Sequence, residues 1–509
     1  MLGRAGKYSS GGAGPGGKLF LESASRLVYN TPDRGSVRPL VFSGAAFLFA
    51  FLPLLIGVYY MIPARLAQTR NRLLLCASLL FYAWGEPVWV ALLVVSACVD
   101  YTCGRLLGRL RARGARAGAR KAVLLVSLCT NLGLLGTFKY LDFFLESLGL
   151  LLGRGLPLAG LTLPIGISFY TFQTLSYTID VYRGKVGVQR SFDRFLLYVS
   201  LFPQLIAGPI VRYSTVESQL EKRSVSLLDF SAGAQRFIVG FGKKMLLANP
   251  LGAIAAQAFG ADAALLSPGM AWLGAVCWSF QVFYDFSGYS DMAIGLGRIF
   301  GFRFEENFVY PYIAQSVTGF WKRWHISLST WFRDYVYIPL GGSRKGPARQ
   351  VLNILLVWGL VGLWHGAAWN FVLWGLYYGV LLVLEKFVWG RAAARLPRVL
   401  RHVYTVLLTL LGMVIVNATS LQHIGAYFAA MFGAGSGYLH GAARLVLDHK
   451  AEFFFAVLFA MPAAKYAGEW LRKRPWGEAL RLAGLMALFA LGAISLVRSS
   501  YNPFIYFRW

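Results

Sequence analysis

The chain has 509 residues, of which 57% are hydrophobic and only 14% are charged. This composition excludes an ordinary soluble globular protein and predicts an integral membrane protein. The net charge of +28 does not indicate a nucleic-acid partner, because the cations lie in short loops between apolar runs, where they act as topology signals beside membrane lipid.

The amino-terminal residues differ from the rest of the chain. Residues 1–40 are Gly-rich and polar and carry six Lys or Arg. We predict a disordered basic extension over 1–40, followed by a transmembrane domain over 41–509. The apolar run that starts at Val41 is long for a signal peptide and has no small-residue cleavage site.

Apolar stretches long enough to cross a membrane recur along the whole chain. A bilayer core about 30 Å thick needs around 20 apolar residues per helix, and the sequence offers roughly eleven such stretches, which predicts an all-α polytopic membrane protein. They are Val41–Ile62, Leu73–Trp84, Pro87–Leu107, Ala122–Leu152, Leu161–Tyr182, Phe195–Val211, Ala271–Phe300, Val351–Trp369, Phe371–Trp389, Val403–Ala418 and Ala479–Val497. Weaker candidates lie at 237–259, 425–432 and 452–466.

The loops between these stretches alternate in charge. The loops at 63–72, 105–121 and 183–194 carry three, seven and four cations, whereas the loop at 85–87 carries none and the one near Arg154 carries one. The positive-inside rule makes the basic loops cytoplasmic and the protein a multi-pass protein of the inner membrane. It also places the amino terminus outside, against the charge of residues 1–40. The alternatives are a translocated disordered tail or a start of translation near Val41.

Two motifs in the middle of the chain do not look like simple spans. In "FPQLIAGPIVRY", Pro203 and Pro209 predict a kinked or broken helix of the kind that lines a cavity. In "DFSGYSD", Asp285 lies four residues before Tyr289, and Ser287 four before Asp291. These pairs indicate either polar contacts between helices or the wall of a substrate tunnel, and the sequence favours neither.

The segment "GFWKRWHISLSTWFRDYVYIPLGGSRKG" has a composition that cannot face lipid. If Trp321–Arg333 is one helix, Trp321, His325 and Ser329 share a face. We expect an amphipathic or re-entrant helix with its tryptophans at the headgroup level, followed by a turn with a basic cytoplasmic tip.

His325 and His365 are the candidate catalytic residues, because a histidine within a membrane segment is costly unless it faces a polar path. The structural alternatives are a headgroup-level anchor for His325 and a hydrogen bond between helices for His365. A neutral imidazole can accept a proton from a hydroxyl, as a general base does in acyl transfer. Ser327 lacks a "GxSxG" elbow, and Asp334 lies on the opposite helical face, so direct transfer fits better than an acyl-enzyme.

The sequence carries only weak indications of which groups would stabilise an oxyanion or bind a metal. Proximity to the histidines makes four residues candidates for the substrate tunnel: Trp324, Trp364, Ser327 and Arg323. The five cysteines have no metal-ligand spacing, so we expect no metal site.

These motifs together resemble the membrane-bound O-acyltransferase (MBOAT) family, and within it the bacterial alginate O-acetylation type. The resemblance covers nearly everything from Val41 onward and rests on "LPIGISFYTFQTLSYTIDVYRG", "FPQLIAGPIVR", the segment from "DFSGYSD" to "GGSRKG", "GLWHGAAWNFVLWG" and the terminal "YNPFIYFRW". The amino-terminal extension departs from the family pattern, which starts close to "VFSGAAFLF".

The resemblance implies an MBOAT fold, with transmembrane, re-entrant and interfacial helices around a central tunnel. It implies acetyl-CoA as acyl donor on the cytoplasmic side, no permanently bound cofactor, an extracytoplasmic esterase-like partner and a polysaccharide acceptor. By motif, His365 in "WHG" matches the catalytic histidine and His325 in "RWHIS" the second conserved polar position. His365 is then the base toward the acceptor hydroxyl, while His325 positions the reactants or shares that role.

Other functions remain open from the sequence alone. Relatives that export D-alanine for teichoic acids share both histidine motifs but generally lack the "GGxRKG" turn present at 341–346, which favours acetyl transfer. Acylation of a lipid is a further alternative. A polysaccharide transporter without transferase activity would have a similar composition, but the chain shows no paired repeats of the kind common in transporters.

Overall fold

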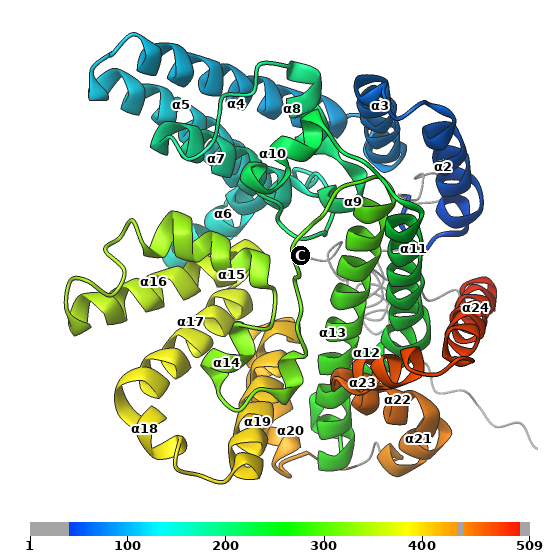
Figure 1. Ribbon diagram of the computed structural model, residues 1–509. Helices are drawn as coiled ribbons and strands as arrows, with labels where there is room; N and C mark the ends of the chain where they lie inside the picture. Colours follow the sequence, from blue (N-terminus) through cyan, green and yellow to red (C-terminus); the bar gives the residue numbers. More distant parts are fainter. Residues whose placement is uncertain (1–39, 436, 438–440, 499–509) are drawn as a thin grey trace, which may run out of the picture. The chain divides into compact units, whose positions relative to one another are not determined.

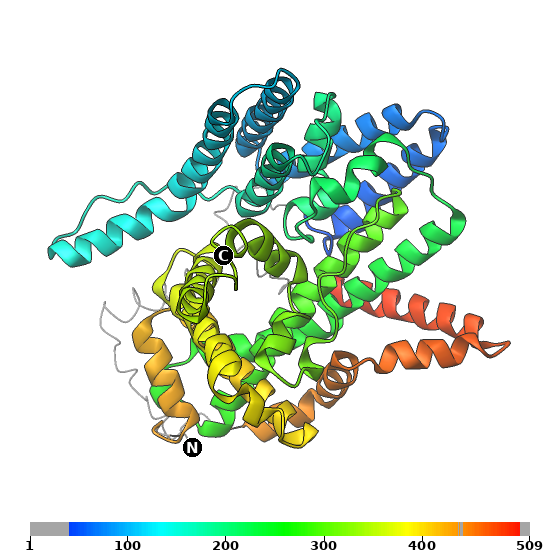
Figure 2. The same ribbon diagram turned by 60° about the vertical axis from the view of Figure 1, so that its left-hand side comes forward.

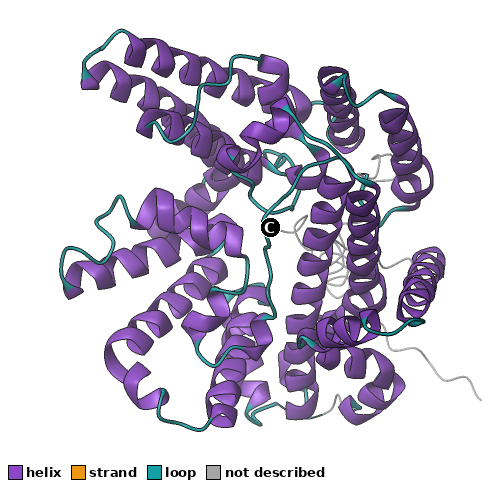
Figure 3. Ribbon diagram, viewed as in Figure 1, coloured by secondary structure: helices purple, strands orange, loops and turns teal. Residues whose placement is uncertain are grey.

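The computed structural model describes residues 40–435, 437 and 441–498, which belong to one compact unit. All regular structure in these residues is helical (Figure 3), as expected for an all-α protein. The predicted extension over 1–40 lies, except for Leu40, outside the described residues, as does the terminal "YNPFIYFRW" motif. The two-domain boundary therefore stays a prediction.

Within the described residues, seven helical segments are long and apolar enough to cross a membrane. They are α4 (Trp89–Ala112), α5 to α6 (Ala117–Leu152, through η2, Gly136–Tyr140), α11 to α12 (Leu227–Gly260, through η3, Lys243–Ala248), α16 (Pro347–His365), α17 to α18 (Trp369–Ala393, through η7, Glu385–Trp389), α19 (Arg398–Asn417) and α24 (Gly477–Arg498). A multi-pass membrane protein follows from these segments.

Several of the predicted stretches are shorter or broken. Val41–Ile62 holds only η1 (Phe47–Phe51) and α2 (Leu52–Met61), and Leu161–Tyr182 becomes α7, which begins at Ile167 after Pro164. Phe195–Val211 splits into two helices around the predicted proline break. Conversely, the weak candidate at 237–259 belongs to the long α11–α12 segment.

The remaining helices are short, apart from α3, α7 and α13. They are α3 (Ala67–Gly85), α7 (Ile167–Arg183), α8 (Phe192–Ser200), α9 (Phe202–Leu205), α10 (Tyr213–Glu221), η4 (Ala263–Leu265), α13 (Pro268–Ile299), η5 (Pro311–Ile313), α14 (Val317–Trp321), α15 (Ile326–Phe332), η6 (Arg333–Tyr337), α20 (Leu421–Met431), α21 (Ala442–Asp448), α22 (Lys450–Ala460) and α23 (Ala463–Arg472).

The longest of these, α13, is almost entirely buried and packs along α11 and α12 (Figure 1, Figure 2). Its start is set by Ser267, whose hydroxyl accepts the N–H of Met270, and by Pro268 in the first turn. Gly240 and Gly288 let α11 and α13 approach closely, because a Cβ on Gly240 would lie 2.5 Å from the carbonyl oxygen of Gly288.

Ion pairs join α13 to the α11–α12 segment. Lys244 Nζ lies 2.7 Å from Asp285 Oδ1, and both side chains are buried. Six residues further along α13, Asp291 accepts from Arg236 and from Lys243, at 2.9 and 2.6 Å. Both acids of "DFSGYSD" therefore form polar contacts between helices. Such pairs reduce the cost of charges in an apolar interior.

Candidate active site

His325 lies at a break between two helices and not within one. The condition that Trp321–Arg333 is one helix is not met: α14 ends at Trp321 and α15 begins at Ile326. At the break His325 adopts φ 44° and ψ 53°, a left-handed conformation that is uncommon for a residue other than glycine. The grouping of Trp321, His325 and Ser329 on one helical face therefore does not hold.

The break is held by pairing with the extended segment around Asn307. The N–H of Ile326 donates to the carbonyl oxygen of Asn307 at 3.0 Å, and the N–H of Val309 donates to that of Arg323 at 2.9 Å. These backbone groups satisfy each other, so the break leaves neither N–H without a partner.

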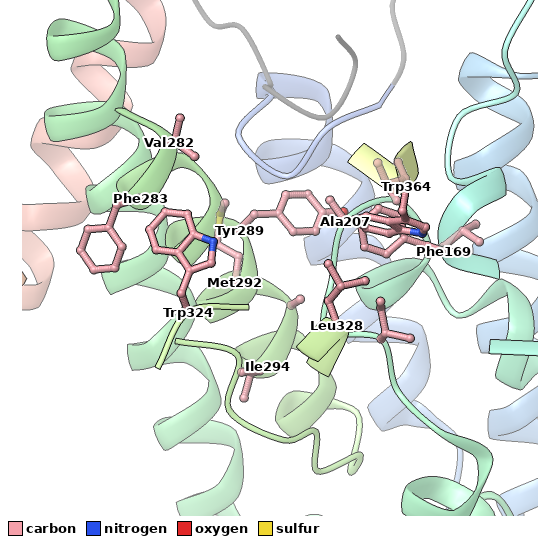
Figure 4. Close-up of a cluster of buried hydrophobic side chains, with 14 of the residues drawn as sticks. Phe169, Ala207, Val282, Phe283, Tyr289, Met292, Ile294, Trp324, Leu328 and Trp364 are labelled. Carbon is pink, nitrogen blue, oxygen red and sulfur yellow. The ribbon is translucent and has the colours of Figure 1, made fainter. Parts of the chain in front are cut away.

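The tryptophans around this break are enclosed by protein, whereas we expected them to lie against lipid headgroups. Trp321, Trp324 and Trp331 are only 4–6% exposed. The Trp324 ring packs 6.1 Å from Phe283 of α13 (Figure 4). Trp331 stacks on Phe172 of α7 with ring centroids 3.7 Å apart. Aromatic neighbours from several helices thus replace the bilayer surface as their environment.

Asn307 orients the His325 ring. Its Oδ1 accepts from Ser327 twice, from the backbone N–H at 3.1 Å and from the hydroxyl at 2.9 Å, and lies 3.2 Å from His325 Nδ1. Because the backbone N–H is an obligate donor, the amide oxygen faces His325, and Nδ1 carries the proton. His325 Nε2 then presents its lone pair, and it has no hydrogen-bond partner among the described residues.

His365 is the last residue of α16 and lies beside His325. The two ring centroids are 6.3 Å apart at an interplanar angle of 66°, and the side chains are 5% and 1% exposed. The helix hairpin α16–α17 sets this position, since a Cβ on Gly362 would lie 2.3 Å from the carbonyl oxygen of Phe371. Two imidazoles forty residues apart in sequence thus share one buried region.

Two indole rings lie close to the histidines. The Trp364 ring lies 5.1 Å from His365 and 5.8 Å from His325, and the Trp374 ring lies 4.9 Å from His365. Both Nε1 atoms are buried, and neither finds a hydrogen-bond acceptor within the part of the chain that the structure describes. Trp364 also packs on Phe169 of α7 (Figure 4). These groups are available donors for an oxygen atom of a reactant.

The other residues predicted near the histidines have structural contacts. Ser327 Oγ donates to Asn307 and accepts the N–H of Ile210 at 3.1 Å, so the "FPQLIAGPIVRY" loop meets the histidine segment here. Arg323 donates to the carbonyl oxygen of Val309.

Asp334 is the acid nearest in sequence to His325 and is not its partner. Its carboxylate accepts from Arg333 and Arg212, at 2.7 and 2.8 Å. Partial burial would raise the pKa of Asp334, but these two guanidinium groups hold it below the ordinary value. The carboxylate is therefore ionised and bound to two arginines. This agrees with the interpretation from the sequence that Asp334 does not act with His325 in a Ser-His-Asp triad.

The tunnel candidates on α13 have contacts of their own. Asp285 and Tyr289 line a small cavity with Lys244, and Asp291 lies in the ion pairs described above. The same helix reaches the site through other residues: the Phe286 ring lies 4.6 Å from His325, and Ser290 Oγ accepts from Asn307 Nδ2 at 3.2 Å. No cluster of three or more His, Cys, Asp or Glu suited to a metal occurs among the residues described.

Comparison with known proteins identifies the family. The membrane-bound O-acyltransferase family model matches residues 161–419. A protein of Azotobacter vinelandii described as a probable alginate O-acetylase is 39% identical, over 92% of this chain and all of the relative. The chain belongs to the membrane-bound O-acyltransferase family.

Two further relatives place the O-acyltransferase more narrowly. The peptidoglycan O-acetyltransferase of Helicobacter pylori is 31% identical over 92% of this chain and 98% of its own length. The teichoic acid D-alanyltransferase of Bacillus subtilis is 28% identical over 46% of this chain and 62% of its own. The chain is thus an enzyme and a probable O-acetylase, and a transporter without transferase activity is not retained.

Sequence reasoning missed two residues that contact the candidate site. Asn307 lies in "EENFVYP", where nothing local marks it, because its partners are 18 and 20 residues away. Lys139 donates to the carbonyl oxygen of Trp364, the residue before His365. A lysine within an apolar stretch is itself a signal of function, and this criterion would have found Lys139.

Proposed function

We propose that this O-acyltransferase moves an acetyl group from acetyl-CoA on the cytoplasmic side to an acceptor hydroxyl on the other side of the inner membrane. The acetyl group then reaches an alginate-like exopolysaccharide or a cell-wall polymer through an extracytoplasmic esterase-like partner. The full-length similarity to an alginate O-acetylase and a peptidoglycan O-acetyltransferase supports this. About eleven spans, some of them short, surround the reaction tunnel.

The observation that carries the proposal is the pair of buried imidazole rings of His325 and His365, whose centroids lie 6.3 Å apart. His365 takes the proton from the acceptor hydroxyl as its oxygen attacks the thioester carbonyl. The carbon–sulfur bond then breaks, and the CoA thiolate takes up a proton. His325, with Nδ1–H held by Asn307 and Nε2 free of described partners, positions the reactants or shares the proton.

Groups around the two histidines lower the activation barrier of acetyl transfer further. The indole N–H groups of Trp364 and Trp374 are the donors available to the developing oxyanion. One such donor is worth about 2.7–4 kcal/mol in enzymes that stabilise a tetrahedral intermediate. Holding donor and acceptor together in a dry site lowers the barrier further.

The test measures release of CoA and transfer of labelled acetyl by the purified protein in nanodiscs, with its partner and an acceptor polymer. His365→Ala should lower transfer by at least a hundredfold, the usual contribution of a general base, and His325→Ala by at least tenfold. His449→Ala, which changes a histidine at the start of α22, is the matched control and should keep wild-type rates. Normal transfer by His365→Ala would refute the mechanism.

A D-alanyl thioester on a carrier protein is the second candidate donor, since the Bacillus subtilis D-alanyltransferase aligns with about half of the chain. The same assay with a D-alanyl carrier thioester in place of acetyl-CoA decides between the two. Faster turnover of the D-alanyl donor would replace acetyl-CoA in this proposal.

A further inference from the structure

Asn307, which orients His325, lies in a segment with few backbone restraints. Residues 302–310, between α13 and η5, form no helix, and Asn307 within them is 0% exposed. Among the described residues, no hydrogen bond ties the backbone groups of residues 304–306 to the rest of the protein. The position of Asn307, and with it the orientation of the His325 ring, therefore also depends on side chains that hold this segment.

Glu306, the residue before Asn307, supplies such a tie. Its two carboxylate oxygens accept from the guanidinium group of Arg236 in α11, one of them from Nη1 at 2.5 Å and the other from Nη2. The same guanidinium group donates from Nε and Nη2 to Oδ1 of Asp291 in α13, at 3.0 and 2.9 Å. Arg236 thus joins the segment to two packed helices at once, with the planar fork of donors that only arginine has.

The two consecutive residues Glu306 and Asn307 have opposite surroundings. The Glu306 side chain is 50% exposed, whereas Asn307 is fully buried against His325 and Ser327. The ion pair therefore holds the segment from its outer side, while the amide acts on its inner side. A displacement of Glu306 reaches Asn307 through a single peptide unit, which is planar and stiff.

The backbone on both sides of this contact is strained. Tyr310 and His325 have φ values of 45° and 44°, and they are the two residues other than glycine with positive φ in the described part of the chain. They lie on two stretches that pair with each other beside Asn307. Such conformations persist only where the surroundings hold them in place. The bridge through Arg236 is a restraint of this kind, one residue away from Asn307.

We propose that Arg236 and Glu306 are positioning residues of this O-acyltransferase, which act through Asn307 to keep the proton on Nδ1 of His325. The effect on the reaction rate rests on the proposed function, whereas the effect on the His325 ring does not. Without the bridge, Asn307 is free to shift away from the ring, and the proton distributes between the two ring nitrogens. The lone pair on Nε2 is then lost in a part of the molecules.

The first experiment measures the tautomer of His325 by solid-state NMR of the full-length protein in nanodiscs, with histidine labelled with 13C and 15N. The chain has six histidines, and the signals of His325 are those missing from His325→Ala. Wild type should show one tautomer, with the proton on Nδ1.

Two variants remove the bridge in different ways. Glu306→Gln should show both tautomers, and it leaves no buried charge unpaired, because Glu306 is half-exposed and Arg236 keeps Asp291. Arg236→Lys should also show both, since an ammonium group cannot hold two carboxylates in the same fixed geometry. Glu305→Gln, which changes the exposed acid one residue earlier, is the matched control and should show the wild-type tautomer.

The second experiment measures kcat and KM of acetyl transfer. Glu306→Gln should lower kcat about fivefold, the rate equivalent of one partly exposed ion pair, and should leave KM unchanged. In an Asn307→Ala background the same substitution should change kcat by less than about twofold, because a residue that acts through Asn307 then has no route to the reaction.

Three results would overturn the proposal. An unchanged tautomer in Glu306→Gln would make the bridge an ordinary surface ion pair. An equal loss of kcat with and without Asn307 would show that the bridge acts on the enzyme by another route. Mixed tautomers in Glu305→Gln would show that the loss of any acid in this segment disturbs the ring. If the protein transferred no acetyl group while the tautomers changed as expected, the proposed function would fail and the positioning role would stand.

Discussion

At the scale of single residues, the environment of His325 is set by one amide. Asn307 accepts at the same oxygen from His325 and from Ser327, and its NH2 group donates to Ser290. The amide thus fixes which imidazole nitrogen carries the proton without adding charge. A carboxylate at the same position would hold the ring equally well but would favour the imidazolium form.

Replacing Asn307 therefore has two separable effects. Asn307→Ala should lower acetyl transfer at least tenfold, because the ring loses its orienting partner. Asn307→Asp should keep the ring in place but raise the pKa of His325, so the acidic limb of the pH–rate profile should move to higher pH. The measurement is the acetyl-transfer rate between pH 5 and 9. An unshifted profile in Asn307→Asp would show that His325 does not titrate in the reaction.

At the scale of elements, Glu385 anchors the short helix that precedes His325. Its carboxylate accepts the N–H groups of Val317 and Thr318, at 2.7 and 2.8 Å, and the Thr318 hydroxyl. These are unsatisfied donors of the first turn of α14, and a negative charge there also suits the helix dipole. The start of α14 is thereby fixed to η7.

Glu385→Gln should destabilise the protein by about 1–3 kcal/mol, because an amide nitrogen cannot accept and one buried N–H loses its partner. Thermal unfolding in detergent should show a lower midpoint, and acetyl transfer should fall with it as the His325 segment loosens. The exposed Glu469→Gln in α23 is the control. Unchanged unfolding of Glu385→Gln would refute the anchoring role.

At the scale of the whole molecule, the proposed reaction requires that the donor and the acceptor reach the site from opposite sides of the membrane. In a protein with the exposed Cys76, Cys98 and Cys129 replaced, Gly155→Cys in the loop after α6 should react with an impermeant maleimide in intact cells. Ser343→Cys in the basic turn before α16 should react only after lysis. The reverse pattern would place the loop after α6 on the cytoplasmic side and overturn the orientation assumed in the proposed function.

The sequence was sufficient where a property depends on neighbouring residues and insufficient where it depends on distant ones. The apolar runs around α4, α16 and α19 follow from composition alone. The α11–α12 segment looked weak because Lys243 and Lys244 interrupt it, yet both pair with acids of α13. The break at His325 was missed for the same reason: its backbone partner, Asn307, lies far back in the chain.

The irregular backbone at His325 has a consequence for how the acetyl donor arrives. Asn307 and His325 are 0% and 1% exposed, and non-helical backbone at membrane depth is tolerated only where protein or water encloses it. The surrounding helices must therefore seal this region from hydrocarbon on every side. In the proposed function, the thioester would then enter along the helix bundle from the aqueous phase, which suits a water-soluble donor such as acetyl-CoA better than a lipid-borne one.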